Sequence, residues 1–214
     1  MNLQEAYDLM DLLLDKADQP YFIDEEKNQF LDQAIMAFIN NHYHDYDQEQ
    51  VSRDALSFFF SDIIQASGST GVYILPVDYV HLLQVELGTD TTDMRSAKIL
   101  GTKDYLDFRL SSDPFNRATL EDPICFVRFG TSDSHATNEI HVSPVTLTKA
   151  NIFYISFKPH DIVFGETDAS SNVGPLSEIY QREIIDLSIR KMTGNIEGAN
   201  IQFQQIEAEQ SKSI

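Results

Sequence analysis

The sequence predicts a mixed α+β protein with an N-terminal helical bundle, an antiparallel β-sheet or sandwich domain, and a C-terminal helix with an extended arm. Three observations support this prediction. Apolar residues recur at helical spacing in the first third, runs of branched and aromatic residues separated by Gly, Asp, Ser and Pro fill the middle, and helical spacing returns near the end. We therefore expect segments at 1–67, 68–174 and 175–214, with a short helix inserted in the second and the third packing on the bundle.

Three helices are predicted in the first segment. Asn2 and Glu5 form a capping-box pattern at the start of the first helix, which Pro20 ends. The second begins at Asp24 and ends near Asn40-Asn41, and the third begins near Asp47 and continues until Gly68 stops it. Their apolar positions include Leu3, Tyr7, Met10 and Leu14, then Leu31, Ile35, Phe38 and Ile39, then Val51, Ala55, Phe58, Phe59 and Ile63. Short polar loops favour an antiparallel bundle.

The middle segment has the composition of β-strands. A short helix is predicted over Lys103–Leu110, with exposed loops at 130–138 and Glu166–Gly174. The predicted strands are centred on Val72–Leu75, Leu82–Leu87, Ile124–Phe129, Glu139–Val142 and Ile152–Phe157.

The sequence of the last segment indicates a helix followed by a polar tail. Pro175 suits the first helical position, and Gly194-Asn195 is a helix-stop pattern. A polar tail of this kind orders against a partner, and its isolated apolar residues are the candidates for that contact. We therefore predict that these residues dock on a partner protein or a neighbouring copy; they are Ile196, Ile201, Phe203 and Ile206.

The chain is strongly acidic. It has 34 Asp and Glu against 15 Lys and Arg, a net charge of −19, and residues 1–66 alone carry −11. Proteins that grip nucleic acid rely on clustered Lys and Arg, so this balance argues against such binding, whereas an acidic wall would repel DNA and let it slide. We expect no membrane span, because no apolar run reaches about 18 residues, and no signal peptide, because the N-terminus has no basic region.

The search for catalytic motifs yields one weak metal candidate. The sequence has no Gly-rich phosphate loop, no His-Glu-x-x-His and no paired cysteines. The candidate ligands are His42, His44 and Asp45, in a segment predicted to be an inter-helix loop. Cys125 is the only cysteine and lies in an apolar run, which predicts a buried strand residue. We expect no enzymatic activity and no cofactor.

Three segments carry a resemblance to a known family, and they occur in the same order in the chain: Leu75-Pro76-Val77-Asp78-Tyr79 through Leu83, Ile140–Pro144 with Phe153–Pro159, and Leu176–Glu197. They resemble the tail-adaptor (head-to-tail connector) proteins of tailed bacteriophages, the group that includes tail tubular protein A of podoviruses. A further segment, from Lys103-Asp104-Tyr105 through Asp113-Pro114-Phe115-Asn116-Arg117, is similar to structural proteins of crAss-like and other Bacteroides phages.

This resemblance implies a structural virion protein at the head-tail junction, made in the host cytoplasm. It implies a ring of twelve copies that docks on the portal protein, contacts adjacent tail ring proteins and extends the DNA channel used in genome ejection. The candidates for portal or neighbour docking are then Ile196, Ile201, Phe203 and Ile206. DNA would pass through the lumen without specific binding. The candidates for channel-facing acids recur at three- and four-residue spacing, with an ordinary solvated helix face as the alternative; they are Asp8, Asp11, Asp15 and Asp18.

Three other functions stay open. The chain could be another ring or a head-completion protein of the virion. It could be a metal-dependent hydrolase that uses His42, His44 and Asp45. An acidic DNA mimic is disfavoured, because the residues between 67 and 165 carry a net charge of only −4.

Overall fold

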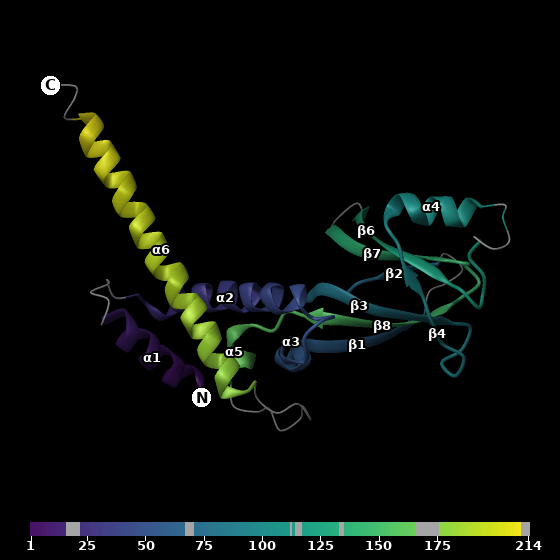
Figure 1. Cartoon of the computed structure of the whole chain (residues 1–214), viewed down its shortest axis with the longest axis horizontal. Helices are drawn as coiled ribbons and strands as arrows, with labels where there is room; N and C mark the ends of the chain where they lie inside the picture. Colours follow the sequence, from purple (N-terminus) through teal and green to yellow (C-terminus); the bar gives the residue numbers. More distant parts are fainter. Residues whose placement is uncertain are drawn as a thin grey trace. The chain divides into compact units, whose positions relative to one another are not determined.

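The chain forms two compact units, and the α+β class predicted from the sequence is confirmed (Figure 1). The computed structural model describes residues 1–15, 22–66, 71–111, 113, 117–132, 135–165 and 176–210, without the side chains of 15, 129–137 and 195–210. Residues 1–58 and 158–214 make the helical unit, and residues 59–157 make the β unit. The helical unit is thus built from both ends of the chain, a division that differs from the predicted segments 1–67, 68–174 and 175–214.

The helical unit is organised around α2 (Asp24–His44), on which α6 (Glu178–Gln210) packs. Buried Phe38 and Ile39 of α2 and Ile184 and Ile185 of α6 supply its core. The predicted capping box begins α1, where Asn2 Oδ1 accepts from the Glu5 amide at 2.8 Å. The other helical elements are α1 (Leu3–Asp15), α3 (Gln50–Leu56), a 3₁₀ turn (Ser57–Phe59) and α5 (His160–Val163).

Two predicted helix ends in the first segment are wrong. The second helix continues past Asn40-Asn41 to His44. The third ends at Leu56, and Phe60–Ala66 form strand β1. Apolar residues in this short segment fit both periods, and antiparallel pairing with a distant strand along its full length selects the strand.

The predicted helix stop at Gly194-Asn195 is also wrong, because α6 continues to Gln210. A glycine inside a helix costs about 1 kcal/mol relative to alanine but keeps its backbone N–H, so it weakens a helix without ending it. The extended tail predicted after residue 195 is therefore helical as far as residue 210. The predicted N1 residue Pro175 and the loop Glu166–Gly174 lie outside the described residues.

The β unit contains two four-stranded sheets. Sheet A has the order β1-β8-β3-β4 and sheet B the order β2-β7-β6-β5; the β5–β6 pair is parallel and the others are antiparallel. The strands are β1 (Phe60–Ala66), β2 (Val72–Ile74), β3 (Tyr79–Gly88), β4 (Arg95–Ser96), β5 (Lys98–Ile99), β6 (Ile124–Ser132), β7 (His135–Ser143) and β8 (Lys149–Ser156).

The loop predicted at 130–138 is largely strand. β6 and β7 stay paired as far as Ser132 opposite His135. Only residues 133–134, which lie outside the described residues, separate the two strands. Cross-strand pairing therefore continues through a sequence whose Gly, Ser and Thr content indicated a loop.

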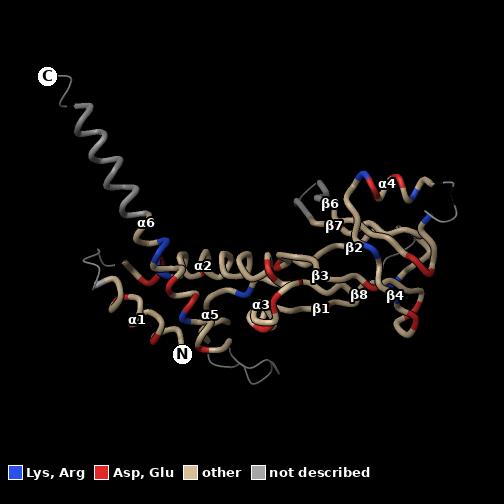
Figure 2. Tube along the Cα trace, in the orientation of Figure 1, with Lys and Arg blue, Asp and Glu red and all other residues tan. Residues whose placement is uncertain are grey.

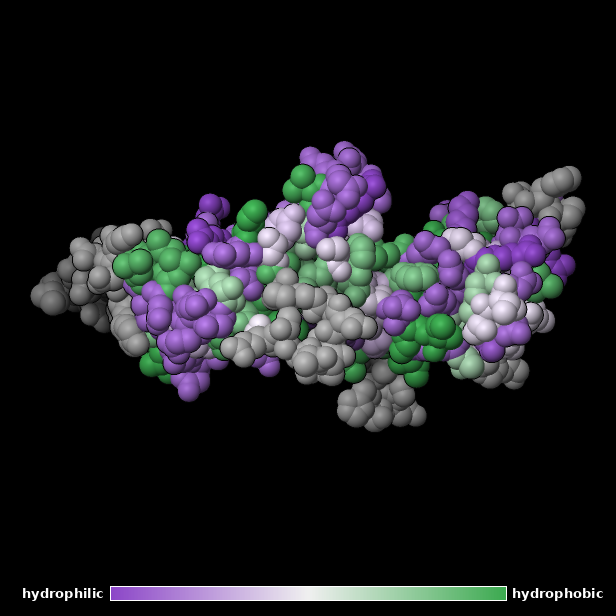
Figure 3. All heavy atoms as spheres, turned by 90° about the horizontal axis from the view of Figure 1, so that it is seen from below, coloured by the Kyte–Doolittle hydropathy of each residue, from purple (hydrophilic) through white to green (hydrophobic). Residues whose placement is uncertain are grey.

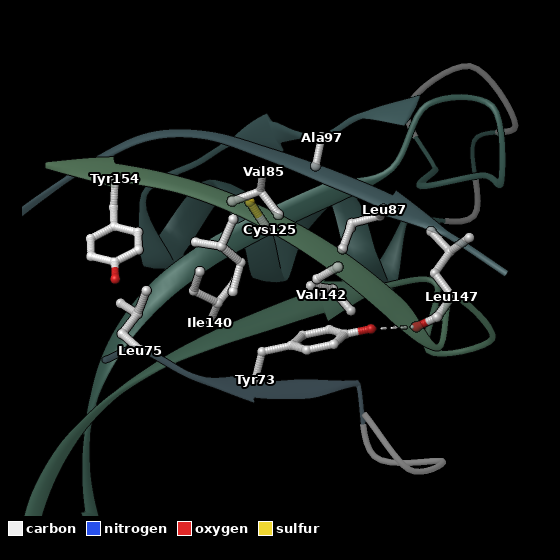
Figure 4. Packing of buried hydrophobic residues seen from close by; sticks show 12 residues of the cluster. Tyr73, Leu75, Val85, Leu87, Ala97, Cys125, Ile140, Val142, Leu147 and Tyr154 are labelled. Atoms are coloured by element: carbon white, nitrogen blue, oxygen red, sulfur yellow. Dashed lines mark hydrogen bonds between the residues drawn. The ribbon is translucent and has the colours of Figure 1, made fainter. Parts of the chain in front are cut away.

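The inner faces of the two sheets enclose the main core of the β unit (Figure 4). Val85 and Ile152 of sheet A and Ile140 of sheet B are fully buried in it. The Tyr73 hydroxyl donates to the Leu147 carbonyl at 3.0 Å, which satisfies the polar end of a buried ring. The opposite side of sheet B is covered by α4 (Thr102–Leu110), the predicted inserted helix, whose Tyr105 ring lies 4.3 Å from that of Phe126.

No helix in the described part of the chain is both long enough and apolar enough to cross a bilayer.

We expect Ile152→Ala to lower the free energy of unfolding of the β unit by about 2–5 kcal/mol, because it leaves a cavity between the sheets. The matched control is Ile64→Ala, on an exposed position of the adjacent strand, which we expect to change it by no more than about 0.5 kcal/mol. Urea unfolding followed by circular dichroism measures both. Equal losses in the two variants would contradict the assignment of the core.

Candidate functional site

A buried lysine holds α1 against α2. Lys27 is 1% exposed, and its Nζ donates to Asp11 Oδ2 at 2.8 Å and lies 3.4 Å from Asp24 Oδ1. The same ammonium lies 5.5 Å from the centre of the Tyr7 ring, and the Tyr7 hydroxyl donates to Asn28 Oδ1. Burial of an ammonium is unfavourable unless anions and hydrogen bonds compensate it, so these contacts specify how the two helices meet.

The four candidate channel-facing acids have different environments. Asp8 is exposed and accepts from Gln4 Nε2 at 3.0 Å, one turn earlier in α1. Asp11 is 31% exposed and is engaged with Lys27. Asp15 ends α1 but its side chain is outside the described part, and Asp18 lies outside the described residues altogether. That any of them faces a channel stays a prediction. Of the two whose side chains the structure describes, Asp8 is the exposed one.

Acidic residues are spread along the helical unit rather than confined to α1 (Figure 2). The first turn of α2 has three consecutive acids, Asp24, Glu25 and Glu26. Acids in a first turn interact favourably with the positive end of the helix dipole. Part of the N-terminal acidic excess is therefore explained by local helix stability.

His42 connects three helices of this unit. Its Nε2 lies 3.3 Å from Glu183 Oε1 on α6, and its Nδ1 lies 3.5 Å from Ser52 Oγ on α3. Its ring also lies 4.4 Å from that of Phe38. These are the residue types of a hydrolytic triad, but Ser52 is only 3% exposed, so its hydroxyl is shielded from a substrate. The geometry is that of a helix-linking contact.

The predicted metal candidates are not brought together. α2 continues through His44, so His42 and His44 lie two positions apart on a helix, about 200° around its axis. His42 faces Glu183, whereas His44 is exposed and Asp45 follows the end of the helix. Within the described ranges, no group of three His, Cys, Asp or Glu side chains has the geometry to hold a metal ion.

Cys125 lies in the core between the sheets, as predicted for a buried strand cysteine. It is fully buried, and Figure 4 shows its sulfur among apolar side chains. Burial raises the pKa of this thiol to about 12. The nucleophilic thiolate is therefore scarce at neutral pH.

The candidate docking residues Ile196, Ile201, Phe203 and Ile206 all belong to α6. Their side chains lie outside the described part of the chain, so their contacts stay predictions.

Sequence reasoning missed a set of exposed apolar residues on both units. Single exposed apolar residues are normal, and only burial could have distinguished these from the core. Hydrophobic residues gather in patches between hydrophilic ones on the face drawn in Figure 3. The most exposed of the set are Val51, Ile64, Ile74, Val77, Leu110 and Ile179.

No protein-family model and no curated protein sequence matches this chain.

We expect Asp11→Asn to lower the free energy of unfolding by about 1–3 kcal/mol, because it removes an ion pair of 2.8 Å from a buried ammonium. The control Asp8→Asn, at an exposed position of the same helix, is expected to change it by no more than about 0.5 kcal/mol. Thermal and urea unfolding measure both. A larger loss for Asp8→Asn would show that the Lys27 contact does not hold α1.

We expect Cys125 to resist iodoacetamide at pH 8 in the folded protein, because its pKa of about 12 leaves almost no thiolate and its side chain is buried. In urea the same thiol has its ordinary pKa and should react at least tenfold faster. Intact mass spectrometry over time follows the reaction. Equal rates with and without urea would contradict the burial.

Proposed function

We propose that this protein is a structural virion component that forms a ring between the portal and the tail of a bacteriophage and extends the DNA channel. The proposal combines the resemblance of the sequence to tail adaptors with the form of α6 and the distribution of charge. In it the ring docks through the C-terminal half of α6 and contacts adjacent tail ring proteins.

The observation that carries the proposal is the length of α6 compared with the length of α2. α6 has 33 residues, and α2, the helix against which it packs most extensively, has 21; α1 also contacts α6. At a rise of 1.5 Å per residue these lengths are about 50 Å and about 31 Å. α2 is therefore too short to cover α6 from end to end. Isolated helical segments are only marginally stable in water. We therefore expect the part of α6 that α2 cannot cover to pack against a partner.

The sequence of α6 extends an apolar stripe into its C-terminal half. Ile185, Ser188 and Met192 are buried at spacings of three and four. The same spacing continues through Ile196, Ala199, Phe203 and Ile206. Ile201 falls off this stripe. Three of the four candidate docking residues thus have the spacing of a single helix face, as expected of a helix that docks by one face.

The charge supports the channel part of the proposal. The net charge of −19 opposes adhesion of DNA, whose backbone is also negative. A channel through which DNA moves benefits from such weak adhesion. The acids of the helical unit, with exposed Asp8 among them, are the candidates for the channel surface.

The first test is the mass of the purified protein in solution, alone and with its candidate portal, by native mass spectrometry or light scattering. We expect a ring, of twelve copies if it matches the portal, either alone or only on the portal. A monomer that ignores the portal would overturn the proposal. A ring that ignores the portal but binds another head or tail protein would instead indicate a different ring or head-completion role.

A variant pair tests α6. We expect Phe203→Asp to weaken portal binding at least tenfold, because it places a charge on the apolar stripe, and Ile201→Asp, off the stripe of the same helix, to have a much smaller effect. Light scattering of the protein-portal mixture measures both. Equal binding by the two variants and the wild type would show that this half of α6 is not the docking element.

A further inference from the structure

The β unit has one long sheet edge. Sheet A ends in β1 and β4, and sheet B ends in β2 and β5. β1 has seven residues, whereas β4 and β5 have two each and β2 has three. Short edge strands are one of the ways in which proteins avoid pairing with other chains. Three of the four edges have this protection, and β1 does not.

β1 also lacks three features that protect other edge strands, namely proline, lysine and a β-bulge. Its sequence, Phe60-Ser-Asp-Ile-Ile-Gln-Ala66, contains no proline and no lysine, and Asp62 is its only charge. Its pairing with β8 runs without a register shift, whereas the β3–β8 pairing is irregular at two places. Ile64 is 58% exposed in the middle of the strand. These features are typical of an edge that accepts a further strand.

In the same unit, part of β6 has a neighbouring strand on only one side. β6 pairs with β5 only at Ile124 and Cys125, and with β7 along its whole length. In the described part of the chain, no strand lies on the β5 side of residues 126–132. The part of the β6–β7 hairpin that extends past β5 and β2 has only two strands. A two-stranded ribbon is only marginally stable in water without a third strand or a packed face. Residues 126–132 thus match β1 in length.

We propose that β1 of one copy pairs with residues 126–132 of β6 of the next copy, so that sheet A of one subunit continues into the β6–β7 hairpin of its neighbour. This contact rests on the proposed ring. Acceptor and donor are different surfaces of the same chain, so each copy accepts one strand and donates another, which is the head-to-tail arrangement that a ring requires. Asp62 and Arg128, the only charged residues of the two segments, have opposite signs, so no like-charge repulsion opposes the pairing.

The test compares Ile64→Lys with Ile74→Lys in the ring assay with the portal. Both positions are isoleucines of edge strands with nearly equal exposure, 58% and 56%, but Ile74 lies on the three-residue strand β2. A lysine on an edge strand opposes pairing with another chain. We expect Ile64→Lys to reduce the assembled fraction at least tenfold and Ile74→Lys to leave it unchanged. Circular dichroism and thermal unfolding check that both variants are folded.

Hydrogen exchange on the wild-type protein gives a second readout that needs no variant. We expect the amides of residues 60–66 and 126–132 to gain protection when the ring forms. A ring in which neither segment gains protection, or one that assembles equally well with Ile64→Lys, would overturn the strand pairing and leave the ring itself intact. If the wild-type protein forms no ring with the portal or alone, both the proposed function and this contact are wrong.

Discussion

The pairing of β1 with β8 is the constraint on which the two-unit organisation depends. The strands are joined from Phe60 opposite Ile155 to Ala66 opposite Lys149, across most of the β unit's sequence. Buried Ser156 stabilises this pair at the start of β1. Its hydroxyl donates to the Phe59 carbonyl at 3.0 Å and lies 2.9 Å from the Ser61 hydroxyl. The chain therefore enters and leaves the β unit side by side, and its two ends are free to build one helical unit.

Within the helical unit, polar contacts complement the apolar packing on α2. Asp32 of α2 accepts at Oδ1 from the His160 backbone amide at 3.0 Å, with His160 Nδ1 at 2.9 Å from the same atom. Gln181 of α6 donates to the Val163 carbonyl at 3.0 Å. These directional contacts specify the approach of the returning chain, which apolar packing alone leaves less defined. Lys27 has the same role for α1.

Local patterns predicted the class of the fold, the strands of its middle and the capping of α1, because each depends on neighbouring residues. They did not predict β1, since Phe59, Ile63 and their neighbours suit a helix until β8 is placed beside them. They also stopped α6 at Gly194, where the energetic cost is too small to end a helix. The pairing of Lys27 with Asp11 was missed because it joins two helices. The exposure of Ile64 was missed because periodicity does not distinguish an edge strand from a core strand.

The insertion of the β unit has a consequence for the order in which the protein is completed during synthesis. All of residues 59–157 precede α6, so the β unit can fold on the ribosome while the helical unit still lacks the helix that covers Phe38 and Ile39. The helical unit is therefore completed only after α6 has been synthesised. A product of translation that stops before α6 would carry the whole β unit but would lack the helix that covers Phe38 and Ile39, so its helical unit would expose apolar surface.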